Sequence, residues 1–420
     1  MDSKILLPPF LTRLTLLPTG TLPQARHLIF SRSLRAFADG YVVILLPYYL
    51  TLLGFSATKI GLLLTATLLG SGLMTLSIGF IAHRFPTRSL LFGASFLMCL
   101  TGIGMVECHE FWPLMLVAIF GTINPSGGDV SIFLPLEQSL LTQYSSASSR
   151  TALFARFSLF AGLASALGSQ AAALPTLLSD WSGLSLKNIF EIMFLAYSLC
   201  GLSTLSLYRC LPVDKTALPP SKNHKPLGVS RSRVYALAAV FSIDAFGSGF
   251  AVQSLLALWL YQKFGIGLTQ IGSIMMASSL LASLSFMVAP YLAQRIGLLN
   301  TMVLTHIPAN VFLILVPFMP NYPSAVALLL LRAALSSMDV PTRNSYVMAV
   351  VTPPERPAAA SLTNVPRSLA SALSPALAGY MLSISSFGWP LVVCGCLKIL
   401  YDLVLWKMFK SVKPPEENQL

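Results

Sequence analysis

The chain has 420 residues, of which 55% are hydrophobic and only 10% are charged, and its formal net charge is +12. Soluble domains carry about 25% charged residues, so this composition excludes an ordinary soluble protein. The basic residues stand in short stretches between long apolar runs, which argues against a nucleic-acid-binding surface. An α-helix needs roughly 20 apolar residues to cross a bilayer, and the alternating polarity of β-barrel strands is not seen. The sequence therefore predicts an all-α membrane protein.

The first segment, residues 1–32, resembles a signal peptide only at first sight. Its apolar stretch is interrupted by Pro8, Pro9 and Arg13, and no small-residue cleavage site follows it. We therefore expect a cytoplasmic N-terminal extension that is retained in the mature protein.

Twelve apolar runs follow in chain order and predict twelve transmembrane helices. A basic, proline-rich stretch, residues 210–232, divides them into an N-terminal six-helix bundle (33–209) and a C-terminal six-helix bundle (233–410), with a cytoplasmic tail at 411–420. The predicted helices span residues 34–54, 58–82, 88–107, 111–140, 150–175, 187–209, 233–262, 268–293, 297–318, 322–350, 359–384 and 386–409.

The distribution of basic residues predicts the orientation. If both termini are cytoplasmic, 20 of the 27 Lys and Arg residues fall on the cytoplasmic side. Positive charges concentrate on that side of membrane proteins, so we predict cytoplasmic termini.

The two halves repeat in sequence. The segment 54–61 (Gly-Phe-Ser-Ala-Thr-Lys-Ile-Gly) matches 265–272 (Gly-Ile-Gly-Leu-Thr-Gln-Ile-Gly), an offset of 211 positions. Arg156 and Arg367 share that offset, and Asp129 and Asp339 are 210 apart. Six helices in each half make the repeats parallel.

This organisation resembles the major facilitator superfamily. The motif between the second and third helices of that family matches here at Gly79, Arg84 and Arg88, whereas His83 replaces its acidic residue and Pro86 replaces its second glycine. The resemblance implies twelve helices in two six-helix pseudo-repeats, and a central cavity lined by helices one, four, seven and ten.

Four charged residues suggest a cytoplasmic gate. Asp129 and Asp339 lie near the cytoplasmic ends of helices four and ten, and Arg84 and Arg295 follow helices two and eight. We predict two symmetry-related pairs, Arg84 with Asp129 and Arg295 with Asp339. Static ion pairs at helix ends are the alternative.

Charges deeper in the membrane suggest a substrate or coupling site, because a charge at mid-bilayer costs about 2.5–3.5 kcal/mol and usually has a function. The candidates are Asp244, Arg332, Asp39 and Arg367. Asp244 could carry a proton, or it could form a structural pair with Arg332. Lys398 and Asp402 are four residues apart, so we expect them to neutralise each other.

Other types of site are not predicted. The cluster Glu107-Cys108-His109-Glu110 is better explained as a loop than as a metal site, and no nucleotide-binding loop is present. We expect no enzymatic activity, no cofactor and no metal. The five histidines are dispersed along the chain.

The resulting hypothesis is a monomeric, plasma-membrane secondary transporter of a small organic solute, which works by alternating access, is proton-coupled and acts in export. The alternatives are proton-coupled uptake of a metabolite or metal chelate, and a non-transporting membrane sensor or receptor.

Overall fold

The computed structural model describes residues 17–81, 84–126, 131–145, 150–212, 230–351 and 356–410. Half of the predicted N-terminal extension (residues 1–16), most of the linker, the tail, His83 and Asp129 lie outside these ranges. The described part is helical, apart from one isolated bridge between Thr21 and Ser145. Its α-helices, with the 3-10 turn η1 (Val316–Phe318), are α1 (Ala25–Leu52), α2 (Ala57–Ile81), α3 (Thr87–Glu107), α4 (Phe111–Phe120), α5 (Phe133–Gln143), α6 (Arg150–Ala171), α7 (Leu174–Ser182), α8 (Leu186–Arg209), α9 (Arg231–Gly249), α10 (Gln253–Phe264), α11 (Leu268–Ile296), α12 (Leu298–Leu315), α13 (Tyr322–Ser336), α14 (Asp339–Val350), α15 (Arg356–Ile384) and α16 (Trp389–Phe409).

These helices correspond to the twelve predicted spans, and the fold prediction is confirmed. Seven of the described stretches are long and apolar enough to cross a bilayer as single units, and α4 and α13 are shorter apolar helices. Spans four, seven and ten are each divided into two helices: α4 and α5, α9 and α10, α13 and α14.

Local sequence explains the breaks in spans four and ten. In span ten, Pro341 has no amide hydrogen to donate to a carbonyl of the preceding turn, and α13 ends at Ser336, just before it. In span four, Gly121 and Pro125 interrupt the helix after α4. In span seven the chain turns at Val252, which is extended with ψ at 147°, before α10 begins.

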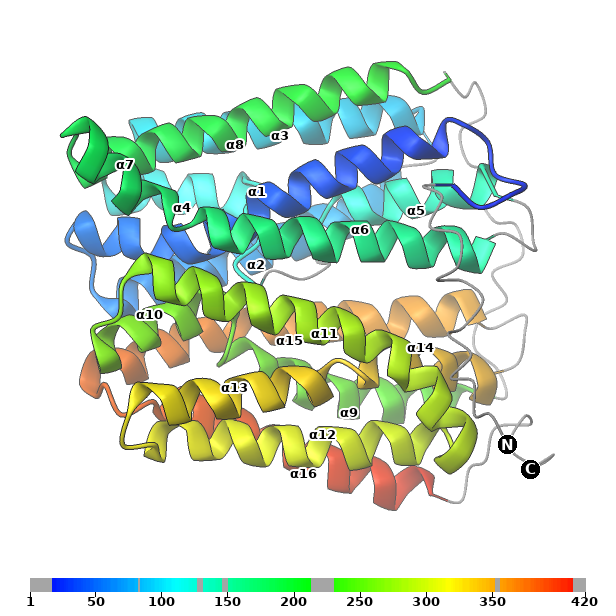
Figure 1. Cartoon of the computed structure of the whole chain (residues 1–420). Helices are drawn as coiled ribbons and strands as arrows, with labels where there is room; N and C mark the ends of the chain where they lie inside the picture. Colours follow the sequence, from blue (N-terminus) through cyan, green and yellow to red (C-terminus); the bar gives the residue numbers. More distant parts are fainter. Residues whose placement is uncertain are drawn as a thin grey trace, which may run out of the picture.

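The helices form two bundles (Figure 1). Helices α1–α8 make the upper half of the view and α9–α16 the lower half. The main contacts between halves are α2 with α15 and α6 with α11. Helices α2 and α15 are spans two and eleven, and α6 and α11 are spans five and eight. Span two of the first half corresponds to span eight of the second, and span five to span eleven, so the repeat relates one contact to the other, as expected for parallel halves.

Close backbone contacts repeat the same symmetry. A methyl group on Gly40 of α1 would lie 2.3 Å from the carbonyl oxygen of Ser165 in α6. A methyl group on Gly249 of α9 would lie 2.1 Å from the hydroxyl of Ser374 in α15. Both pairs are related by 209 positions, so the repeat seen in the sequence is also a repeat of helix packing.

The ends of the bundle differ in how the halves meet. The start of α1, the end of α8, the start of α9 and the end of α16 lie at one end, on the right in Figure 1, which we call the linker end. The other end is called the far end. Between described groups, all hydrogen bonds that join the halves lie from mid-span to the far end: Tyr48–Ile266, Thr58–Ser383, Ser254–Val43, Ser254–Pro125, Ser273–Gln170 and Ala376–Thr65. The structure is therefore closed at the far end.

Candidate functional site

A buried network of charges lies inside the C-terminal half. Asp244 of α9 is 1% exposed. Its carboxylate lies 2.7 Å from Lys398 Nζ of α16, 3.5 Å from Arg343 Nη1 of α14 and 3.9 Å from Arg367 Nη2 of α15. Arg343 also donates to Asp339 at 2.8 Å. We call these five residues the C-half charge cluster. Four helices meet there, so the cluster ties the interior of this half together.

Helical spacing on α16 positions Lys398. Cys394, Lys398, Tyr401, Asp402 and Leu405 are all buried and follow a three-to-four-residue repeat, so they form one inward face of α16. Lys398 and Asp402 do not pair with each other as predicted. Lys398 binds Asp244 on α9, and Asp402 binds Nδ1 of His306 on α12 at 3.0 Å. Partners on neighbouring helices supply better geometry than the next turn of the same helix.

The N-terminal half has a second network with the charges exchanged. Arg35 of α1 forms an ion pair with Glu137 of α5, and Glu137 also accepts a hydrogen bond of 2.7 Å from Tyr208 of α8. The Arg35 guanidinium lies 3.9 Å from the centre of the Phe133 ring. Arg35 and Asp244 are 209 positions apart, so equivalent points of the two halves carry opposite charges. No described ion pair crosses between the halves.

The coupling candidates have different surroundings. Asp244 and Arg367 belong to the C-half charge cluster. Arg332 of α13 is only partly buried and makes no ion pair among the described residues. The alternative of an Asp244–Arg332 pair is therefore wrong, and Lys398 is the residue that pairs with Asp244. Asp39 of α1 is also partly buried, and its electrostatic neighbours are Arg35 and Arg32.

Of the two predicted gate pairs, Arg295 with Asp339 is not formed in this conformation. Asp339 is occupied by Arg343 on the next turn of α14, because the two residues face the same side of that helix. Arg295 is exposed and lies over the Tyr291 ring, with 4.5 Å between guanidinium carbon and ring centre. Arg84 is described and exposed, but its proposed partner Asp129 lies outside the described residues.

Glu137, Arg343 and His306 are the network residues that sequence reasoning missed. Glu137 and Arg343 stand toward the cytoplasmic ends of spans, where a charged side chain can usually reach water. Both are buried in the structure, with Glu137 at 0% and Arg343 at 4% exposure. The available signal was the four-residue spacing of Asp339 and Arg343, which places opposite charges on one helix face.

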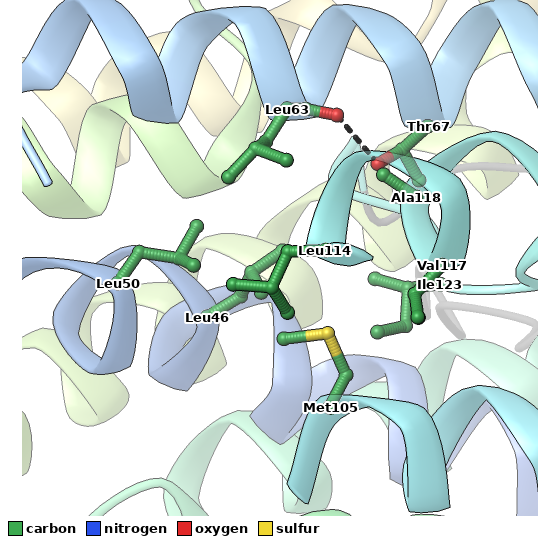
Figure 2. A pocket seen from close by; sticks show the side chains of 9 residues that line it. All are labelled: Leu46, Leu50, Leu63, Thr67, Met105, Leu114, Val117, Ala118 and Ile123. Carbon is green, nitrogen blue, oxygen red and sulfur yellow. Dashed lines mark hydrogen bonds between the residues drawn. The ribbon is translucent and has the colours of Figure 1, made fainter. Parts of the chain in front are cut away.

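A small apolar pocket lies elsewhere, between α1, α2, α3 and α4 (Figure 2). The only polar side chain lining it is Thr67, whose hydroxyl donates to the carbonyl of Leu63 on its own helix at 2.8 Å. With a volume of about 20 Å³, it holds little more than one water-sized molecule. We interpret this pocket as a packing gap and not as a solute site.

The sequence profile of the Major Facilitator Superfamily matches residues 28–331 and 237–420. The chain belongs to the major facilitator superfamily. It is therefore a multi-pass membrane transporter of small molecules and not an enzyme.

Solved structures share this major facilitator fold. A bacterial homolog of the human lysosomal transporter Spinster, in an inward-facing, unoccupied conformation, has a TM-score of 0.70 at 15% identity and covers 94% of this chain and 100% of its own. The nucleoside transporter NupG has a TM-score of 0.70 at 13% identity, covering 93% and 100%. The xylose transporter XylE of E. coli, inward open, has a TM-score of 0.68 at 14% identity, covering 90% and 95%.

A curated relative matches over most of its length. An uncharacterized membrane protein of Saccharomyces cerevisiae is 23% identical over 421 residues, which cover 92% of this chain and 94% of the yeast protein.

Proposed function

We propose that this major facilitator is a proton-coupled secondary transporter of a small organic solute that works by alternating access. The observation that supports it best is the distribution of contacts. Each half has its own buried ion network, whereas the described hydrogen bonds between halves gather from mid-span to the far end. Two internally braced bodies joined at one end are suited to rocking about a site between them.

The proposed site lies between the two halves, near the middle of the membrane. We propose that the linker end is cytoplasmic, that the membrane is the plasma membrane and that the protein works as a monomer. Export is the proposed direction. The solutes named for the similar structures include nucleosides and xylose, so the fold similarity does not select one.

The far-end contacts provide a direct test of alternating access. The hydroxyl oxygens of Thr58 on α2 and Ser383 on α15 are 2.9 Å apart and exposed. Replacing both with cysteine is expected to give a disulfide across the halves, because two side chains this close are within bridging reach. Oxidation should reduce solute exchange in proteoliposomes at least about tenfold, and reduction should restore it, since a locked far end stops the cycle.

The controls are the two single variants, Thr58→Cys and Ser383→Cys, which contain the same native cysteines but cannot form this bridge. Mass spectrometry of the oxidised double variant verifies the link between 58 and 383. If the bridged protein exchanges solute at the unbridged rate, the halves do not rock and alternating access is excluded. That outcome would favour the sensor or receptor alternative.

Proton coupling is proposed to depend on Asp244, a buried carboxylate among basic groups. Its test uses the double variant Asp244→Asn with Lys398→Gln, which keeps a hydrogen-bonding pair and removes both charges. Accumulation of solute driven by a proton gradient should fall at least about tenfold, while exchange without a gradient continues, because exchange moves no net proton. The solute is one selected by thermal-shift screening of the purified protein. Unchanged gradient-driven accumulation would disprove coupling at Asp244.

A further inference from the structure

Arg367 of α15 is the least satisfied member of the C-half charge cluster. Its side chain is 32% exposed, and its single ion contact is the 3.9 Å approach to Asp244. Its Nε atom is buried and has no hydrogen-bond partner among the described residues. A guanidinium has five N–H donors, so most of its hydrogen-bonding capacity remains available here.

Asp244 cannot satisfy Arg367 in addition to its other partners. Its Oδ1 accepts from Lys398 at 2.7 Å, and its Oδ2 is shared with Arg343. The cluster has three cations (Lys398, Arg343, Arg367) and two carboxylates (Asp244, Asp339), which leaves one positive charge in excess. The remaining nearby acid, Asp402, is bound by His306. An uncompensated cation in a low-dielectric interior is costly unless an anion joins it.

The exposed part of Arg367 does not belong to the lipid-facing surface of its helix. The exposed apolar residues of α15 are Leu373, Leu377, Tyr380 and Ile384, at 54%, 47%, 56% and 67%. At about 100° per residue they form one stripe, and Arg367 points roughly 110° away from it. Its side chain faces α9 and α14, which are parts of spans seven and ten. Spans seven and ten are among the helices that the sequence resemblance leads us to expect around the central cavity.

We propose that Arg367 binds an anionic group of the transported solute, either a carboxylate or a phosphate. This inference rests on the proposed transport function and assigns the substrate class to it. A carboxylate or phosphate would supply the acceptors that Arg367 lacks and neutralise the excess charge of the cluster. Arginine presents its donors as a planar fork, which fits two oxygens of such a group at once. A cationic solute would meet net positive charge and be repelled.

The test compares aromatic solutes of different charge. The probes are 4-phenylbutyrate and phenyl phosphate as anions, 4-phenylbutanol as the neutral analogue and 4-phenylbutylamine as the cation. Ligands that bind the folded state raise its unfolding temperature, so thermal unfolding of the full-length purified protein is followed with each probe. We expect at least one anion to raise the unfolding temperature clearly more than the neutral and cationic analogues.

Variants then assign the effect to Arg367. Arg367→Gln should weaken binding of the stabilising anion at least about tenfold, since it removes charge-assisted hydrogen bonds. Arg367→Lys should preserve the preference for anions with lower affinity. Lys407→Gln, at an exposed position of α16, removes the same charge and should bind as the wild type does.

Three outcomes would overturn the proposal. One is that neither anion stabilises the wild-type protein. A second is that the neutral or cationic analogue stabilises it as well as the anions do. The third is that the Arg367→Gln protein, folded by its own unfolding transition, retains the anion effect. Stabilisation by the neutral or cationic probe would leave alternating access intact, because the Thr58–Ser383 crosslink tests that function without reference to charge.

Discussion

Replacing Asp244 by asparagine is expected to lower the stability of the folded protein by about 3–5 kcal/mol, because it leaves buried cations without their counter-charge. Lys398, Arg343 and Arg367 all lie within 4 Å of this carboxylate. With the charge removed they would repel one another in an interior that water does not reach, since Asp244 is 1% exposed. Thermal unfolding of the purified protein, together with the yield of monodisperse material, measures the effect.

The double variant Asp244→Asn with Lys398→Gln separates the cost of leaving Lys398 without a counter-charge from the cost of losing the ion pair itself. It removes one charge of each sign, so it should recover part of the stability lost in Asp244→Asn, with a coupling energy above about 1 kcal/mol. Asp180→Asn, on the exposed surface of α7, is the matched control and should stay within about 0.5 kcal/mol of the wild type. Equal unfolding temperatures for Asp244→Asn and Asp180→Asn would show that the cluster does not hold the C-terminal half together.

Replacing Gly61 by alanine is expected to force the far end open. A methyl group at this position of α2 would lie 2.4 Å from the carbonyl oxygen of Pro375 and 2.9 Å from the α-carbon of Gly379, both on α15. Backbone atoms cannot rotate away, so α2 and α15 must separate. Overpacking of this kind costs about 1–3 kcal/mol, which changes the ratio of the closed and open far-end states by roughly 5- to 150-fold. The rate of disulfide formation between Thr58→Cys and Ser383→Cys, measured in the Gly61→Ala protein, should fall as the far end opens.

Gly72 provides the control on the same helix. A methyl group there meets no atom within 4 Å. Gly72→Ala should leave the crosslinking rate unchanged and could gain up to about 1 kcal/mol of helix stability. If Gly61→Ala crosslinks as fast as Gly72→Ala does, the close approach of α2 and α15 does not control closure of the far end.

Composition and the length of the apolar runs were sufficient to predict the fold, because the bilayer constrains both. A helix is the main way to satisfy backbone polar groups in lipid, and its length is set by the membrane. The apolar runs therefore located the twelve spans, and the repeated segments 54–61 and 265–272 indicated two related halves. The breaks in spans four, seven and ten were not predicted, and in span seven no proline marks the break. The chain there is instead held from the other half, where the Ser254 amide donates to the Pro125 carbonyl.

The candidate site was predicted only in part. Asp244 and Arg367 were selected because an unexplained charge within an apolar run is costly, and both belong to the cluster. Their partners were not found. Spacing alone predicts a pair of Lys398 with Asp402, and Arg343 was not identified as a partner. Neighbours along a helix can be read from spacing, but contacts across helices require the packing.

The sequence by itself thus determined the number of spans, the division into halves and the presence of charges that must be compensated, because these depend on the cost of exposing polar groups to lipid. The tertiary structure alone decided how those charges are compensated. In the C-terminal half, Lys398 of α16 pairs with Asp244 of α9. At the equivalent position of the N-terminal half, Arg35 pairs with Glu137. Arg367 keeps N–H donors without hydrogen-bond partners among the described residues. Residues far apart in the chain make these contacts, and helix rotation and packing at glycines such as Gly40 and Gly249 bring them together.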